Sequence, residues 1–282
     1  MGLGCLGQLP GMGGVNNSKN FILNCNSWKE KYKNLSTKTE SILNSVQICS
    51  SDIAIAPVTG AEQNIGYTSE QDFYLPYFTS AYKNNIDICV GDGAPDEKLK
   101  FGIKAVEKLN TKAYFVLKPY PNDVLFKRID WIGKNAKGIG IDIDAYNIVT
   151  MRNQVHLEKK SLEQLEAFRK KSGMPLIIKG VFSAEDIELC KTVKPEIIVV
   201  SNHGGRVETK TESSANFLEA YGKELKNYCS ELWVDGGIRC AEDIKVAKYF
   251  GADKVLIARP VISALCKGGI PLAEEYLKSL IR

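Results

Sequence analysis

From Asp52 onward the chain repeats one unit, which consists of a short apolar strand, a turn and an amphipathic helix. The apolar runs are uninterrupted, which is typical of strands buried on both faces of a parallel sheet. The predicted strands are Ile53–Pro57, Ile86–Val90, Tyr114–Leu117, Gly138–Ile143, Leu176–Lys179, Ile197–Val200, Leu232–Val234 and Lys254–Ala258. The predicted helices are Gln71–Lys83, Asp96–Leu109, Asp123–Asn135, Leu162–Lys171, Ala184–Thr192, Ala215–Tyr228, Glu242–Phe250 and the closing segment Leu272–Ile281.

Eight β-α units with right-handed crossovers close into a barrel. We therefore predict an α/β fold, a single-domain TIM (β/α)8 barrel over residues 51–282. An open doubly wound sheet is the alternative, but it usually has fewer strands and a Gly-rich turn after its first strand. Residues 1–50 are predicted to be an N-terminal extension. Its Gly-rich start could fold over the barrel mouth as a lid, and the polar stretch Ser27–Ser41 is expected to be helical and to pack against the outside.

The composition narrows the class of protein. A hydrophobic content of 44% and a net charge of +4 are ordinary for a soluble globular chain of 282 residues. Scattered Lys and Glu argue against a nucleic-acid surface, and no apolar run approaches the roughly 20 residues of a membrane span. The eight cysteines include no C-x-x-C pair and are expected to be reduced, and the start is not a signal peptide, so a cytoplasmic location is predicted.

Charged and glycine-rich residues gather where the predicted strands end, whereas the strands themselves are apolar. In a barrel of this kind the active site lies at the carboxyl ends of the strands. This concentration is the main indication from the residues alone that the protein is an enzyme.

The end of the sixth predicted strand is the most informative of these positions. It reads Ser201-Asn202-His203-Gly204-Gly205-Arg206, which puts a proton acceptor, two glycines and a fixed cation within six residues. The alternative is a Gly-rich turn with a solvated arginine. A turn built only for shape needs neither the histidine nor the arginine, and the chain has just two histidines.

The ends of the seventh and eighth strands predict an anion site. Asp235-Gly236-Gly237-Ile238-Arg239 offers backbone N–H groups beside an arginine, and Arg259 follows the neighbouring strand. The loops after these two strands are the usual phosphate site of the barrel. A tight turn with two surface arginines is the alternative. The Asp235 carboxylate suits the hydroxyls of a ribityl or ribose chain.

Three further charged residues are predicted to face the barrel mouth. Lys179 ends an apolar strand, where a buried cation is costly unless it is paired. It could lie beside a cofactor that becomes negative on reduction, or form a salt bridge to Asp142 or Asp144, and both can hold. Asp142 and Asp144 lie two apart on one strand and share a face. We favour Asp144 orienting His203 over a divalent metal site.

These motifs resemble the FMN-dependent α-hydroxy-acid oxidase/dehydrogenase family, which includes glycolate oxidase, lactate oxidase and L-lactate dehydrogenase flavoproteins. The resemblance is dense from about Pro175 to Pro260 and collinear back to Ile53. The segments that carry it are Lys179-Gly180 with Ala184-Glu185-Asp186, Ser201 to Arg206, Asp235 to Arg239, and Gly251-Ala252-Asp253 through Ala258-Arg259-Pro260.

The resemblance implies FMN as cofactor and a role for each matching residue. His203 would be the active-site base supported by Asp144, and Arg206 would bind the substrate carboxylate. Lys179 would stabilise the anionic reduced flavin. The implied cofactor residues are Pro57, Val58 and Thr59 against the isoalloxazine, Asp235 on the ribityl chain, Gly236, Gly237, Arg239 and Arg259 at the phosphate, and Lys179, Ser201 and Ala258 beside them.

The chain departs from the family pattern near its third and fourth strands. The family often has a Gln and a Tyr at the end of the third strand, where this chain has Val116 and Lys118, with Tyr120 close by. A second substrate arginine usually follows the fourth strand, and here the nearest is Arg152, in a different local pattern. Lys118, with Tyr120, is therefore predicted to take part in binding the substrate carboxylate.

The resulting functional prediction is FMN-dependent oxidation of a small L-2-hydroxy acid, similar to lactate or glycolate, to the 2-oxo acid, with oxygen or another molecule as electron acceptor. One alternative is an FMN-dependent isomerase of the isopentenyl-diphosphate isomerase type, which lacks the Ser201–Arg206 run. Another is a barrel that binds flavin without turnover. The resemblance also suggests a homo-oligomer, a tetramer or larger.

Overall fold

The structure is a computed structural model. It describes residues 19–147, 155–207 and 209–281. The Gly-rich start, for which a lid is predicted, lies outside the described residues, as does Arg152.

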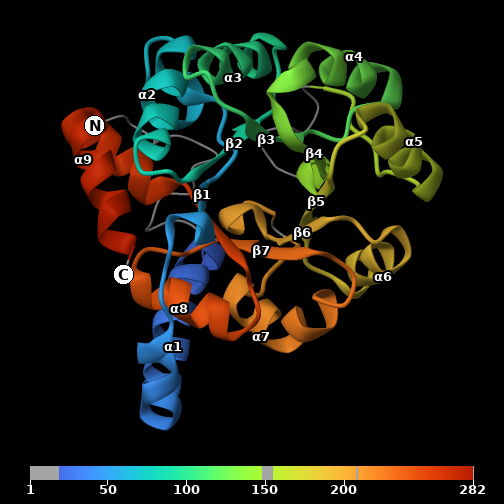
Figure 1. The fold of residues 1–282 in the computed structure, drawn as a ribbon. Helices are drawn as coiled ribbons and strands as arrows, with labels where there is room; N and C mark the ends of the chain where they lie inside the picture. The colour runs from blue at the N-terminus through green and yellow to red at the C-terminus, as the bar shows by residue number, and fades with distance from the viewer. Residues whose placement is uncertain (1–18, 148–154, 208, 282) are drawn as a thin grey trace.

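The described strands form a closed parallel barrel in the order β1-β2-β3-β4-β5-β6-β7-β8. Figure 1 shows the strands at the centre with helices around them. The strands are β1 (Ile53–Ile55), β2 (Asp87–Gly91), β3 (Ala113–Leu117), β4 (Ala136–Asp142), β5 (Leu176–Val181), β6 (Ile197–Val200), β7 (Glu231–Asp235) and β8 (Lys254–Ile257). Each coincides with a predicted strand to within about two residues at either end, so the predicted TIM barrel is confirmed.

The helices follow the strands as predicted. They are α1 (Lys19–Ser45), α2 (Gln71–Tyr82), α3 (Glu97–Lys108), α4 (Asn122–Ile132), α5 (Leu162–Ser172), α6 (Ala184–Val193), α7 (Ser214–Leu225), α8 (Ala241–Tyr249) and α9 (Arg259–Leu280). Short turns of helix lie at η2 (Ser50–Asp52), η3 (Ala61–Ile65), η4 (Gly133–Asn135), η5 (Ala145–Asn147) and η7 (His203–Gly205).

The closing helix differs from the prediction. The sequence indicates a helix only from Leu272, whereas α9 begins at Arg259, directly after β8. Gly268 and Gly269 have non-helical backbone angles and kink α9. Because this kink interrupts the helical spacing of apolar residues, the sequence pattern did not indicate the first half of the helix. None of the described helices is both long and apolar enough to cross a membrane.

Two apolar layers hold the barrel together. A smaller cluster fills the barrel interior and includes Cys89, Ile177 and Trp233, with the Tyr114 ring packed edge-on against Trp233 at 4.9 Å. A larger cluster joins the outer faces of the strands to the helices. Because the interior is packed with side chains, the open space of the barrel lies at the ends of its strands.

Helix α1 packs beside α8 and α7, on the outside as predicted, and its first turns also reach η7 at the barrel end (Figure 1). Phe21, Asn24 and Trp28 are at most 4% exposed. The contact between the start of α1 and the barrel end was not predicted. Phe21, Asn24 and Trp28 follow the spacing i, i+3 and i+7, which is typical of a buried helix face and could have indicated this contact.

Candidate active site

A cavity of about 890 Å³ opens at the carboxyl ends of the strands, within the size range of small-molecule sites. Most of the predicted site residues line it. They are Pro57, Val58, Thr59, Lys118, Lys179, His203, Arg206, Asp235, Gly236, Gly237, Arg239, Ala258 and Arg259. Asp144, Ser201 and Tyr120 are not among the lining residues.

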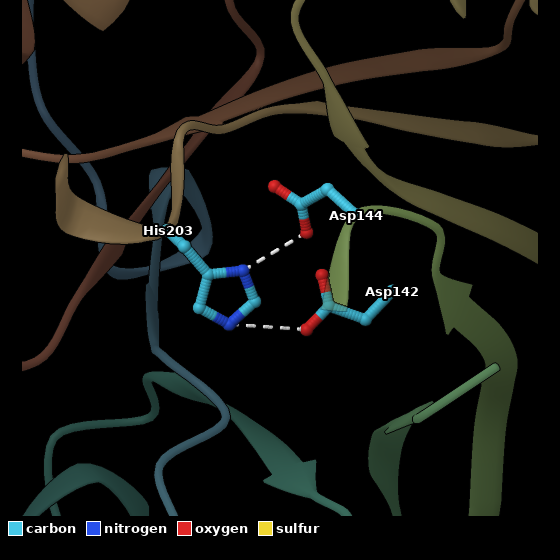
Figure 2. A group of neighbouring side chains, drawn as sticks. All are labelled: Asp142, Asp144 and His203. Atoms are coloured by element: carbon cyan, nitrogen blue, oxygen red, sulfur yellow. Dashed lines mark hydrogen bonds and ion pairs between the residues drawn. The ribbon is translucent and has the colours of Figure 1, made fainter. Parts of the chain in front are cut away.

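His203 lies between two carboxylates, as Figure 2 shows. Its Nδ1 is 3.0 Å from Asp144 Oδ1, the contact expected from the sequence. Its Nε2 is 3.2 Å from Asp142 Oδ2, a second contact that the sequence did not indicate. The backbone places the ring here, since His203 has a positive φ of 59° and its N–H donates to Ser201 Oγ. An imidazole held from both sides has its orientation fixed.

Burial lowers the pKa of His203 below its ordinary value, and the nearby cation of Lys179 acts in the same direction, while Asp142 and Asp144 oppose both. Burial and the two carboxylates therefore act on the charge of this ring in opposite directions. Burial alone would raise the pKa of Asp142, but His203, Lys118 and Lys179 hold it well below its usual range.

Asp142, Asp144 and His203 offer ligand atoms within 4.8 Å of one another, which is close enough to hold a metal ion. Lysine side chains already contact both carboxylates, however. Lys118 Nζ is 3.0 Å from Asp142 Oδ2, and Lys210 Nζ is 3.1 Å from Asp144 Oδ2. A divalent cation would meet these ammonium groups at short range, so the arrangement favours an ion-pair network over a metal centre.

Lys179 is 3% exposed and connects the ends of three strands. Its Nζ donates to Ser201 Oγ at 3.0 Å and lies 3.2 Å from Asp235 Oδ2 and 3.5 Å from Asp142 Oδ1. Burial disfavours its charge, but the carboxylates of Asp142 and Asp235 outweigh burial and raise the pKa of Lys179. Lys179 thus forms the predicted salt bridge and also lines the cavity, while its role beside a cofactor stays a prediction.

Ser201 is fully buried and contacts residues that line the cavity. Its hydroxyl donates to Asp235 Oδ1 at 2.6 Å and accepts from Lys179 Nζ at 3.0 Å. These contacts orient Asp235 and Lys179, and the part of Ser201 in cofactor binding stays a prediction.

The two residues predicted to replace the missing substrate ligands also differ from each other. Lys118 lines the cavity with its cation paired to Asp142. Tyr120 is 6% exposed, and its ring packs against the Arg128 guanidinium, whose Cζ is 4.2 Å from the ring centroid. The expectation that Tyr120 faces the substrate is not met, because the backbone after β3 directs it into the core around α4.

The phosphate end of the cavity holds Arg239 and Arg259. Neither forms an ion pair with a carboxylate among the described residues, and Arg259 Nη1 is buried there without a hydrogen-bond partner. Burial, followed by repulsion from Arg206 and Arg239, lowers the pKa of Arg259 to about 9. A doubly charged anion such as a phosphate would offset the repulsion between these guanidinium groups.

Helix α1 forms one wall of this phosphate end. The Phe21 ring lies under both arginines, 4.0 Å from Arg259 Cζ and 5.2 Å from Arg239 Cζ. Trp28 Nε1 donates to the Gly236 carbonyl at 2.8 Å. A Cβ on Gly237 would lie 2.5 Å from the Asn24 carbonyl oxygen. The glycine pair, which was predicted to admit an anion, is therefore also required by the close approach of α1.

Residues 104–282 match the model of the FMN-dependent dehydrogenase family. The chain belongs to this family. The match begins in α3 and contains every predicted site residue from Tyr120 onward as well as Lys118, while Pro57, Val58 and Thr59 lie outside it.

Curated relatives in the family include 2-hydroxyacid oxidase 2 of Bos taurus, 34% identical over 42% of this chain and 33% of the relative. The 4-hydroxymandelate oxidase of Amycolatopsis orientalis is 36% identical over the same shares. An L-lactate oxidase of Nostoc sp. is 37% identical over 38% of this chain and 29% of the relative. The chain thus matches about a third of the length of these relatives.

Solved structures of mandelate oxidase share the fold. A variant with a monooxide FMN adduct gives a TM-score of 0.63 at 21% identity, covering 85% of this chain and 81% of that one. A variant with (S)-mandelic acid gives 0.65 at 19% identity, with 92% and 91% covered. At this level of identity the likeness supports the barrel alone.

FMN, the cofactor of the family, fits the residues present. Arg259 Nη1 and Arg239 would hold the phosphate, the Asp235 carboxylate would accept hydrogen bonds from ribityl hydroxyls, and Lys179 would supply a cation beside the flavin ring. Asp235 and Lys179 are already fixed by each other and by Ser201, so they need little reorganisation on binding.

Replacing Phe21 with Ala is expected to weaken FMN binding about tenfold, the size of one buried cation–π contact. The Phe21 ring keeps water from the two arginines, and water would screen their attraction for the phosphate. Titration of the apoprotein with FMN, followed by quenching of flavin fluorescence, measures the change. Ile22→Ala, on the exposed face of the same helix, is the control. An unchanged dissociation constant would show that Phe21 does not contribute to FMN binding. Tighter FMN binding would mean that the Phe21 ring competes with the phosphate.

Proposed function

We propose that the protein is an FMN-dependent enzyme that oxidises a small L-2-hydroxy acid, similar to lactate or glycolate, to the corresponding 2-oxo acid. The observation that carries the proposal is a half-buried His203 held by two carboxylates, in the same cavity as Arg206, Lys179 and the arginine pair Arg239 and Arg259. The curated relatives that support it are 2-hydroxyacid, 4-hydroxymandelate and L-lactate oxidases.

In this proposal Arg206 binds the substrate carboxylate and so orients the α-carbon. Burial lowers the pKa of Arg206 to about 10, and an anionic partner would offset that cost. Lys118 also lines the cavity, and its ammonium group would contact both the substrate carboxylate and Asp142.

Oxidation to the 2-oxo acid releases two protons and two electrons, and His203 takes up one of these protons. The imidazolium formed in this step is flanked by Asp142 and Asp144, and both contacts strengthen when the ring becomes charged. FMN, when bound, would accept the two electrons and the other proton. Lys179 contributes a fixed positive charge at the place where negative charge would accumulate.

We also propose a cytoplasmic location, because the seven described cysteines are free thiols. A homo-oligomer, tetrameric or larger, and oxygen or another molecule as electron acceptor are proposed from the family resemblance.

Identification of the product tests the proposal. The FMN-loaded protein is incubated with L-lactate, glycolate or L-mandelate in air, and the 2-oxo acid is trapped as its hydrazone. We expect a 2-oxo acid from at least one of them. A parallel incubation with isopentenyl diphosphate that yields its isomer, with no 2-oxo acid from any hydroxy acid, would favour the isomerase alternative and contradict the proposal.

A further inference from the structure

Lys210 lies in the loop between η7 and α7, only a few residues after His203, and its side chain points back to the end of β4. Its Nζ is 3.1 Å from Asp144 Oδ2 and donates to the Gly180 carbonyl at 2.6 Å. The side chain is 12% exposed. The loop is held at this position by Asn20, whose Nδ2 donates to the Lys210 carbonyl at 3.2 Å.

The two carboxylate oxygens of Asp144 contact different partners. Oδ1 faces His203 Nδ1 at 3.0 Å, and Oδ2 faces Lys210. The carboxylate is 3% exposed and is packed against the backbone of β5, where a Cβ on Gly180 would lie 2.7 Å from Asp144 Cγ. Gly180 has a φ of +99° and marks a register shift between β5 and β6, so this close approach depends on glycine. Asp144 is therefore held between Lys210 and the imidazole, with Gly180 packed against it.

The charged groups that face His203 come from every neighbouring strand end. Negative charge comes from Asp142 and Asp144 at the end of β4, while Asp235 on β7 contacts Lys179. Positive charge comes from Lys118 after β3 and from Lys179 on β5. Arg206 lies on the same loop as His203, and Asp186 on α6 is 4.0 Å from Lys210 Nζ. Lys118 and Lys179 both contact Asp142, whereas the cation in contact with Asp144 is Lys210.

We propose that Lys210 is a positioning residue that acts on His203 through Asp144, by fixing this carboxylate and offsetting its charge. With Lys210 in place, each carboxylate beside His203 has its own ammonium partner. Without it, the full charge of Asp144 would face Nδ1 and hold a proton on the ring. The importance of a neutral ring rests on the proposed function, but the ion-pair chain itself can be tested without turnover.

The direct test is a titration of the histidine ring signals by NMR in the FMN-loaded protein, comparing the natural chain with Lys210→Met and Lys210→Arg. The chain has two histidines, and His156, with 79% of its side chain exposed, serves as the internal reference. In Lys210→Met we expect the pKa of His203 to rise by about one unit, because the negative charge of Asp144 beside the ring is no longer offset by the ammonium. Lys210→Arg should restore most of the natural value, and His156 should not change.

A second variant separates this role from a general effect on the loop. In an Asp144→Asn background the carboxylate charge is absent, so adding Lys210→Met should no longer raise the pKa of His203. In activity assays the acid limb of kcat/KM should move to higher pH in Lys210→Met by the same amount as the ring titration. A lower activity with an unmoved His203 pKa would overturn the proposal and leave Lys210 a structural contact. If the natural protein oxidises no hydroxy acid, the proposed function fails, while the ring titration still decides the role of Lys210.

Discussion

Replacing His203 with Asn is expected to slow the reduction of bound flavin by a hydroxy acid by about 10²–10⁴-fold, the usual contribution of a positioned general base. Asn keeps a polar side chain beside Asp142 and Asp144 but cannot accept the proton. Stopped-flow measurement of the loss of flavin absorbance under anaerobic conditions gives the rate.

The pH dependence of the same rate gives the control. Because His203 must be neutral to act, the rate of the natural protein should rise with pH through the pKa of His203, which burial places below the ordinary histidine value. The Asn variant should lose this limb and still bind FMN. His156→Asn, at an exposed position, should behave as the natural chain does. A loss of less than tenfold in the His203 variant would argue that another group removes the proton.

Replacing Lys179 with Met is expected to lower the free energy of unfolding by about 3–5 kcal/mol, as the removal of one partner from a buried ion pair does. Met fills a similar volume but leaves Asp142 and Asp235 without the cation that lies between them. Denaturant unfolding of the FMN-free protein at pH 7 measures the change.

The pH dependence of this loss of stability follows from the shifted pKa values of Lys179 and Asp142. The raised pKa of Lys179 means that its contribution is fully present at pH 7 and is lost only at strongly alkaline pH. The lowered pKa of Asp142 means that its contribution is lost as the pH falls through the folded-state value, so the two proteins should converge in acid.

Two further variants sharpen the stability test. Adding Asp235→Asn to Lys179→Met removes the carboxylate that has lost its ammonium partner and should recover part of the stability. Lys191→Met, which breaks an exposed pair with Glu188, should give no measurable change. Equal losses from the Lys179 and Lys191 variants would contradict the view that the buried network stabilises the barrel end.

The barrel could be predicted because its signals are local. Each strand is a short apolar run bounded by turn residues, and a capping box of Ser161 with Gln164 begins α5. The strand ends could likewise be assigned to one site, because a closed parallel barrel brings them to one face. Arg259 and His203 meet in one cavity for this topological reason.

The parts that could not be predicted depend on contacts between distant segments. Phe21 reaches Arg259 across the chain, and Lys210 reaches Asp144 from a loop without regular structure. The spacing of apolar residues along the sequence does not indicate contacts of this kind. Tyr120 shows the opposite error, because proximity in sequence to Lys118 suggested a shared role, while the backbone turns the ring toward Arg128.

The most direct test of the central claim is the visible spectrum of the FMN-loaded protein before and after anaerobic addition of L-lactate and, separately, glycolate. The account predicts that the protein binds FMN and that at least one of these acids bleaches the flavin absorbance. Failure to bind FMN, or a bound flavin that neither acid bleaches, would contradict the assignment of the protein as an oxidising enzyme for small 2-hydroxy acids.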